Sequence, residues 1–132
     1  LIMVDIDHFK KVNDKYGHQV GDSVLREFSS LLQENIRATD HLSRWGGEEF
    51  IILLPETSLK NSVCVAEKVL TAITNYSFSN VGKLTASFGV SKVDPNSSSN
   101  RESLYQVDEA LYQAKNEGRN RVVAYNKLEQ IR

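Results

Sequence analysis

The stretch RWGGEEFIILLP, residues 44–55, constrains the fold of this chain more than any other. Residues 50–54 form an apolar run of strand length, and Pro55 ends the run because proline cannot donate to a hydrogen-bonded ladder. Gly46 and Gly47 tolerate the positive φ angles of a tight turn, so the residues before them are expected to form the partner strand of a hairpin. The chain is therefore predicted to contain a β-sheet built around this hairpin.

Two adjacent acids, Glu48 and Glu49, follow the glycines at the predicted hairpin tip. This arrangement has two interpretations: a solvated turn, or a site at which the acids bind a cation. The motif alone favours neither. The choice depends on which other polar residues the fold brings to the same place.

The remaining elements follow from the spacing of apolar residues, which is helical in some segments and strand-like in others. In chain order, the predicted elements are a strand at 1–4, a helix at 23–35 capped by Asp22, the hairpin, a helix from 57 or 58 to about 76, a strand at 84–93, a helix at 102–117 and a strand at 122–125. The polar stretch 94–100 is predicted to be a surface loop.

The predicted order is β-α-β-β-α-β, followed by α-β. Its first six elements match the ferredoxin-like arrangement, an α+β fold with a mostly antiparallel sheet and helices on one face. In this topology the first strand lies beside the hairpin. Asp5, at the end of the first strand, is therefore expected close to Glu48 at the hairpin tip.

Asp5, Glu48 and the main-chain carbonyl of Ile6 would together offer hard oxygen donors, which suit Mg²⁺, with Mn²⁺ as an alternative. Mg²⁺ takes one or two protein carboxylates and completes its coordination with substrate phosphate and water. Asp5 could instead only cap the strand end. Two facing acids repel each other, however, and a cation would relieve that repulsion.

Two further groups of polar residues have a structural and a functional interpretation. Lys115 and Arg119 flank Gly118, where a helix is predicted to end, and cations are expected there on dipole grounds alone. With a metal site nearby, the same pair would suit a triphosphate. Asn13 and Asp22 could hydrogen-bond to a purine edge, although Asp22 alone is more simply explained as a helix cap.

The composition is that of one globular domain spanning residues 1–132, with 40% hydrophobic and 25% charged residues. The net charge of −1 gives no support for binding to nucleic acid. Cys64 is the only cysteine, which rules out an internal disulfide and fits a reducing compartment. No apolar run reaches the ~20 residues of a membrane span. The abrupt start suggests a fragment of a longer protein.

Four blocks, DIDHFKKVNDKYGHQVGD, RATDHLSRWGGEEF, ASFGVS and DEALYQAKNEGRNRV, together resemble the GGDEF domain of bacterial diguanylate cyclases over nearly the whole chain. The resemblance implies condensation of two GTP into cyclic di-GMP and two pyrophosphates. It also implies a homodimer in which two domains, each holding one GTP, face each other. The fold expected is that of nucleotidyl cyclases and polymerase palm domains.

The resemblance also implies roles for individual residues. By position, these are the metal ligands Asp5, Glu48 and the Ile6 carbonyl, the substrate contacts Lys10, Asn13, Asp22, Gly46 and Gly47, and the catalytic residues Glu49, Lys115 and Arg119. Asn13 and Asp22 would contact the guanine. Glu49 would bind metal or activate the attacking hydroxyl, and the cationic side chains would contact the phosphates.

The tetrapeptide RATD, from Arg37 to Asp40, has little meaning by itself, because a solvated salt bridge is its usual explanation. Its offset from GGEEF matches the family's inhibitory site. There, the resemblance implies that the arginine contacts guanine acceptors of cyclic di-GMP and the aspartate accepts guanine N–H groups. Feedback inhibition is therefore expected, with Lys68 as a secondary basic contact.

The chain departs from the family pattern in two ways. It lacks the usual N-terminal helical stretch with its DxLTGLxNRR-like block, so the loss of a covering helix and of a triphosphate contact is expected. It also has GGEEF in place of GGDEF, which keeps the charge. The alternatives are a non-catalytic module that binds GTP or cyclic di-GMP, and another nucleotidyl cyclase or polymerase palm.

The resemblance further implies control by an attached sensory or receiver domain, whose input signal the sequence does not define. The domain is expected in the cytoplasm, where GTP is, whereas the sequence leaves open whether the parent protein is tethered to a membrane.

Overall fold

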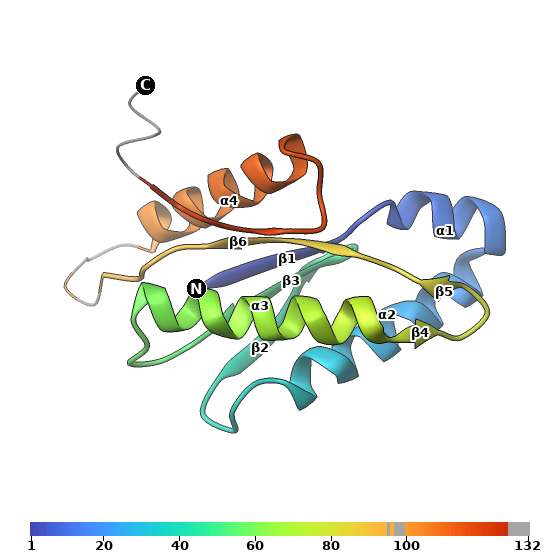
Figure 1. Ribbon diagram of the computed structural model, residues 1–132, viewed down its shortest axis with the longest axis horizontal. Helices are drawn as coiled ribbons and strands as arrows, with labels where there is room; N and C mark the ends of the chain where they lie inside the picture. The colour runs from blue at the N-terminus through green and yellow to red at the C-terminus, as the bar shows by residue number, and fades with distance from the viewer. Residues whose placement is uncertain (95, 97–99, 127–132) are drawn as a thin grey trace.

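The computed structural model describes residues 1–94, 96 and 100–126 (Figure 1). Its elements are β1 (Ile2–Ile6), α1 (Phe9–Tyr16), α2 (His18–Glu34), β2 (His41–Gly46), β3 (Glu49–Leu53), α3 (Leu59–Asn75), β4 (Ser77–Phe78), β5 (Gly82–Lys83), β6 (Ala86–Val90), α4 (Arg101–Asn116) and β7 (Val122–Ala124). Among these, no helix is long and apolar enough to cross a membrane.

The main sheet has five strands in the order β2-β3-β1-β6-β7, and β4 pairs only with β5. All neighbouring strands of the main sheet are antiparallel except β6 and β7. The first four strands in this order are those of the ferredoxin-like arrangement, so the predicted fold class is confirmed. β1 lies between β3 and β6, which makes it the central strand on which the other elements are organised.

Helices cover both faces of the sheet, with α2 and α3 on one side and α4 on the other (Figure 1). Successive side chains of a strand point to opposite faces. Ile2 and Val4 therefore join the core under α2 and α3, whereas Met3 packs against Val107 and Leu111 of α4. Every residue of β1 is buried, as expected for a strand covered on both faces.

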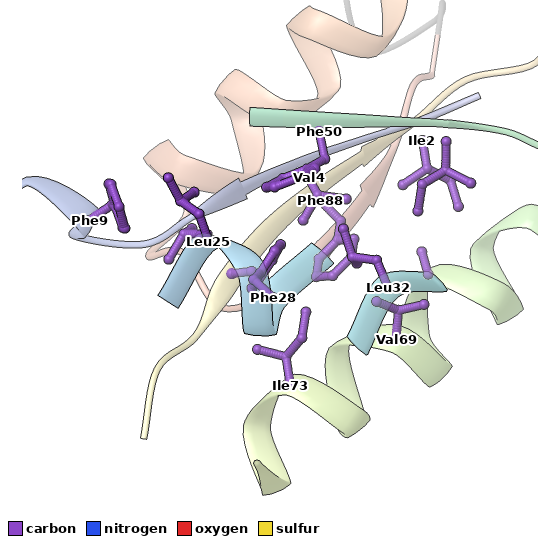
Figure 2. Close-up of a cluster of buried hydrophobic side chains, with 14 of the residues drawn as sticks. Ile2, Val4, Phe9, Leu25, Phe28, Leu32, Phe50, Val69, Ile73 and Phe88 are labelled. Carbon is purple, nitrogen blue, oxygen red and sulfur yellow. The ribbon is translucent and has the colours of Figure 1, made fainter. Parts of the chain in front are cut away.

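Aliphatic and aromatic side chains together fill the core between the sheet and helices α2 and α3 (Figure 2). The Phe28 ring of α2 lies 5.4 Å from the Phe50 ring of β3 and 6.3 Å from the Phe78 ring, measured between centroids. Both separations fall in the range at which aromatic pairs stabilise a core. This packing fixes α2 against the hairpin strand that carries the acidic tip.

The structure adds one helix and two short strands that the sequence did not predict. Helix α1 has eight residues and buries only Phe9 and Val12, so its apolar pattern is too short to stand out. The β4–β5 pair is formed by two residues in each strand. The strand predicted at 84–93 is shorter and covers Ala86–Val90. The predicted loop at 94–100 lies partly outside the described residues.

The prediction that Asp22 caps a helix is wrong. Helix α2 already begins at His18, with Gly17 as its N-cap residue, and Asp22 lies in the second turn. Gly17 has a φ of 89°, which glycine tolerates and which lets the chain turn between α1 and α2. The simplest structural explanation for Asp22 is thereby removed, and its side chain is exposed to solvent.

Candidate active site

The end of β1 and the tip of the β2–β3 hairpin are neighbours in the sheet, as predicted. Asp5 pairs with Glu49 across the β1–β3 ladder, and the Ile6 N–H donates to the Glu48 carbonyl at 3.4 Å. The two acids of the hairpin tip therefore lie beside the first acid of the chain. This proximity depends only on strand register.

A pocket of about 300 Å³ opens where β1 ends, beside the hairpin tip. It brings together most of the residues predicted to bind metal and phosphates. Its lining includes Asp5, Ile6, Lys10, Glu48, Lys115 and Arg119, together with Asp7, His8, Phe9 and Lys11. The pocket thus combines acids that favour a cation with basic side chains that favour an anion.

The Asp5 carboxylate is buried, and its Oδ2 accepts a hydrogen bond from the Lys115 ammonium at 2.5 Å. Burial raises the pKa of Asp5 to about 6, Lys115 opposes this rise, and the nearby charges of Glu48 and Glu49 add to it. Desolvation and like charges therefore both disfavour the ionised form. A cation at this position relieves both penalties.

The donor set at the pocket fits Mg²⁺ or Mn²⁺. Within the described ranges, no three His, Cys, Asp or Glu side chains gather into a metal-binding group. Asp7 also lines the pocket, but its two oxygens accept hydrogen bonds from Thr85, Ser87 and Asn120, so the carboxylates that remain for an ion are Asp5 and Glu48, with the Ile6 main chain beside them. So few protein oxygens suit an ion that completes its coordination with water and phosphate, and they do not suit structural Zn²⁺.

A second and larger pocket, of about 540 Å³, lies between α2 and the hairpin. It is lined by Asp22, Leu25, Arg26, Ser29, Gln33, Leu42, Arg44 and Phe50. Asn13 does not line this pocket, but its side chain lies against Gly21, since a Cβ atom added to Gly21 would be only 1.9 Å from the Asn13 Oδ1. The structure therefore brings Asn13 of α1 close to the residue that precedes Asp22.

Backbone conformation explains why one of the two hairpin positions is a glycine, but not the other. Gly47 has a φ of 51°, a left-handed conformation that favours glycine in a turn. Gly46 does not have a positive φ, and an added Cβ would meet no atom within 4 Å. Neither backbone conformation nor packing accounts for glycine at position 46, and the space beside it is open.

Arg37 and Asp40 contact each other at the start of β2, whereas the acidic tip lies at its end. The Asp40 side chain is only 1% exposed and accepts from the Arg37 main-chain N–H at 2.8 Å. The Arg37 guanidinium is 62% exposed, bonds to Asp40 and donates to the Thr57 hydroxyl at 2.9 Å. In this conformation Arg37, and not Asp40, is presented to a ligand. Lys68 lies exposed on α3.

Sequence analysis missed Asp7, which is buried at the same pocket. Its carboxylate accepts hydrogen bonds from Thr85, Ser87 and the main chain of Asn120. The only signal in the sequence was its position two residues after Asp5, which places both side chains on one face of the strand end. The partners of Asp7 come from segments far along the chain, so the sequence did not reveal them.

Comparison with known proteins places these features in a family. Residues 1–121 match the family described as "Diguanylate cyclase, GGDEF domain". The diguanylate cyclase DgcM of Escherichia coli (strain K12) is 44% identical over 124 residues, which cover 94% of this chain and 30% of DgcM. The response regulator PleD of Caulobacter vibrioides (strain NA1000 / CB15N) is 40% identical over 127 residues, covering 92% of this chain and 28% of PleD.

Solved structures agree with the sequence matches. The active GGEEF domain of a diguanylate cyclase from Vibrio cholerae superimposes with a TM-score of 0.89 at 35% identity, covering 96% of this chain and 81% of that one. The GGDEF domain of DgcB from Caulobacter crescentus, solved in complex with c-di-GMP, gives a TM-score of 0.86 at 32% identity, covering 94% of this chain and 75% of that one.

This chain spans less than a third of the length of DgcM and PleD. The family match over residues 1–121 nevertheless covers the acidic hairpin, helix α4 and the main-sheet strands β1, β2, β3 and β6. The chain belongs to the GGDEF family of diguanylate cyclase domains.

Proposed function

We propose that this domain is a diguanylate cyclase, condensing two GTP into cyclic di-GMP and two pyrophosphates. The observation that carries the proposal is the pocket in which Asp5, Glu48, Lys115 and Arg119 meet. Paired acids and clustered cations in one small pocket suit a triphosphate bound with a divalent ion. The open space at Gly46 supports the proposal, because it leaves room for a nucleotide beside the backbone.

In the proposed reaction the 3′-hydroxyl of each GTP attacks the α-phosphorus of the other, so two attacks close the ring and release two pyrophosphates, and each attack proceeds in the same way. The new P–O bond forms as the bond to pyrophosphate breaks, and the hydroxyl proton is released. Bound Mg²⁺ would neutralise phosphate charge and lower the pKa of the attacking hydroxyl. Asp5, Glu48 and the Ile6 carbonyl would hold that ion, and Glu49 would hold a second ion or accept the proton.

The basic residues of the pocket would act on the leaving group. Lys10, Lys115 and Arg119 would offset the negative charge that develops on pyrophosphate, because preorganised cations stabilise such charge in a water-poor site. Lys115 would have to exchange its contact with Asp5 for one with phosphate when metal and nucleotide enter together. That exchange keeps every charge in the pocket compensated.

The base would occupy the pocket between α2 and the hairpin. The Asp22 carboxylate would accept the two N–H groups on the guanine edge, and Asn13 would supply an amide. Adenine presents a different arrangement of donors on that edge, so a carboxylate here would favour guanine. The exposure of Asp22 and its lack of a capping role support this assignment.

The described residues of one domain provide one metal-and-phosphate pocket and one candidate base pocket, so the proposed reaction needs two domains that face each other. Positioning two triphosphates in line would supply much of the rate. Control by a further domain or partner is part of the proposal. It is supported by the relatives, because one is named a response regulator and the diguanylate cyclase SiaD was solved with its activator SiaC.

Product inhibition at Arg37 and Asp40 is also proposed. The exposed Arg37 guanidinium would donate to guanine acceptors of cyclic di-GMP. For Asp40 to bind guanine N–H groups, the turn that buries its carboxylate would have to open. The complex of DgcB with c-di-GMP supports binding of this ligand by a domain of this fold.

The direct test is turnover. The full-length parent protein, or this chain fused to a dimerising coiled coil, is incubated with Mg²⁺ and GTP, and cyclic di-GMP and pyrophosphate are quantified. The expected result is formation of both products in a 1:2 ratio, and their loss in Glu48→Gln. Glu67→Gln, at an exposed acid of α3, is the matched control and should retain activity. Nucleotide binding without product would instead favour a binding module.

A further inference from the structure

The carboxylate of Asp7 joins three segments at the rim of the metal-and-phosphate pocket. Its Oδ1 accepts from the Ser87 hydroxyl at 2.6 Å. Its Oδ2 accepts from the Thr85 hydroxyl at 2.6 Å and from the Asn120 main-chain N–H at 3.0 Å. The side chain is buried, so these three donors replace water around its charge.

The turn that Asp7 contacts has an unusual backbone. Gly118, Arg119 and Asn120 have successive φ angles of 117°, 63° and 49°. Glycine adopts such values freely and asparagine more readily than most residues, whereas arginine does so at a cost that surrounding contacts offset. Arg119 in particular therefore needs contacts that fix the turn.

The turn is anchored at both ends as well as at Asn120. The Arg119 N–H donates to the Ala114 carbonyl of α4 at 3.0 Å, and the Arg121 carbonyl accepts from the Phe88 N–H of β6 at 2.9 Å. Between these backbone contacts, the carboxylate of Asp7 is the side-chain acceptor for the Asn120 N–H. It connects the turn to the end of β1, two residues beyond Asp5.

We propose that Asp7 is a positioning residue that fixes the turn 118–120 so that Arg119 faces the triphosphate. The inference rests on the proposed function, because it assumes that the pocket takes a nucleotide. Without the carboxylate, the Asn120 N–H loses its acceptor and the left-handed turn loses one of the contacts that hold it in place. Arg119 would then spend less time at the pocket, and phosphate binding would weaken while base binding would not.

A charged carboxylate suits this role better than an amide. Each oxygen of Asp7 accepts a hydrogen bond of 2.6 Å, and one of them accepts the Asn120 N–H in addition. Hydrogen bonds to ionised acceptors are shorter and stronger than neutral ones. Asparagine would keep the shape but would lose the charge and replace one acceptor oxygen with an NH₂ group, which would face either the Ser87 hydroxyl or the Thr85 hydroxyl and Asn120 N–H. Asp7→Asn is therefore the appropriate substitution.

The experiment measures binding by this chain of two probes in the presence of Mg²⁺: a GTP analogue with a methylene bridge between the α- and β-phosphates, and guanosine. In Asp7→Asn, affinity for the analogue is expected to fall about tenfold and affinity for guanosine to change less than about twofold. In an Arg119→Ala background, the same substitution should change analogue affinity less than about twofold. Asp7 is expected to act on the phosphates only through Arg119, so the effects of the two substitutions should not add.

Two measurements separate positioning from general destabilisation. Ser91→Ala removes a buried hydrogen bond at the other end of β6, to the Ser103 carbonyl at 3.2 Å, and should leave both affinities unchanged. In the unmodified chain, hydrogen exchange of the Asn120 amide should be strongly slowed. Exchange as fast as in an unstructured peptide would overturn the proposal even if Asp7→Asn does not fold.

The remaining outcomes are also decisive. The positioning role would be overturned if Asp7→Asn weakened analogue binding equally in the unmodified chain and in Arg119→Ala. It would also be overturned if Asp7→Asn weakened guanosine binding as much as analogue binding. If the unmodified chain binds the analogue and Asp7→Asn binds it equally well, only this inference fails. If the unmodified chain binds neither probe, the proposed function fails and the role of Asp7 in nucleotide binding fails with it, whatever the Asn120 amide shows.

Discussion

The Lys115 ammonium lies 2.5 Å from the Oδ2 of Asp5, so the last helix supplies a cation to the end of the first strand across 110 residues of sequence. The contact neutralises a buried carboxylate that stands beside Glu48 and Glu49. Lys115 thus compensates the acids of the candidate metal site when no divalent ion is bound.

Lys115→Met should therefore destabilise the metal-free domain, because it leaves Asp5 buried without its partner. Since the lysine side chain is 31% exposed, the expected loss is about 1–3 kcal/mol in the free energy of unfolding, below the value for a fully buried pair. Urea unfolding in EDTA measures the loss, and adding Mg²⁺ should recover part of it. Lys60→Met, at an exposed position of α3, is the control. Equal stability of Lys115→Met and the unmodified domain in EDTA would refute this explanation.

Arg37→Ala should abolish product inhibition while the initial rate, measured before product accumulates, stays within about twofold. Affinity for cyclic di-GMP should fall at least about tenfold, because charged hydrogen bonds to the ligand are lost. Arg37→Lys is the informative control: it keeps the charge next to Asp40 but lacks the planar fork, so inhibition should weaken while stability is retained. Inhibition that persists in Arg37→Ala would place the inhibitory site elsewhere.

Gly89→Ala should destabilise the fold strongly. A Cβ at this position of β6 would lie 2.5 Å from the Leu111 nitrogen and from the Val107 oxygen, both in the backbone of α4. Overpacking of this kind costs about 1–3 kcal/mol, and backbone atoms cannot rotate away. Thermal unfolding measures the effect. Gly46→Ala is the matched control, because an added Cβ there meets no atom within 4 Å, and its stability should not change measurably.

Glu27 should make part of the stability dependent on pH. Burial alone would raise the pKa of Glu27, but hydrogen bonds from the Tyr76 hydroxyl at 2.7 Å and from Ser79 outweigh it, and the pKa lies below its ordinary value of 4.5. The ionised form is thus the one that stabilises the fold. Its contribution is present above pH 4.5 and is lost as the pH falls through the lower pKa of the folded state.

Measuring the free energy of unfolding of the unmodified domain and of Glu27→Gln at several pH values checks this dependence. Near neutral pH the variant should be less stable, by under about 1 kcal/mol because the site is mostly solvated. The difference should shrink as the pH falls below 4.5, the ordinary pKa of the residue. A difference that grows on acidification would have the wrong sign for this mechanism.

The sequence was sufficient for the elements whose patterns are local. The hairpin around Gly47, the helix that packs Leu25 and Phe28 inward, and the βαββαβ order all follow from apolar periodicity and turn residues. The proximity of Asp5 and Glu48 followed as well, because strand order within this topology fixes which strand ends are neighbours. The sequence by itself therefore determined the fold class and where the acids gather.

Only the tertiary structure decided how those acids are compensated and supported. Helix α1 is too short for its pattern to predict it, and Asp22 lies inside a helix that starts earlier than its spacing suggested. The contacts of Asp7 with Asn120 and of Asp5 with Lys115 join residues more than 100 positions apart. The spacing of apolar residues in the sequence indicates which side of a helix or strand is buried. The partner of a buried charge depends instead on how α4 and the turn after it pack against β1 and β6.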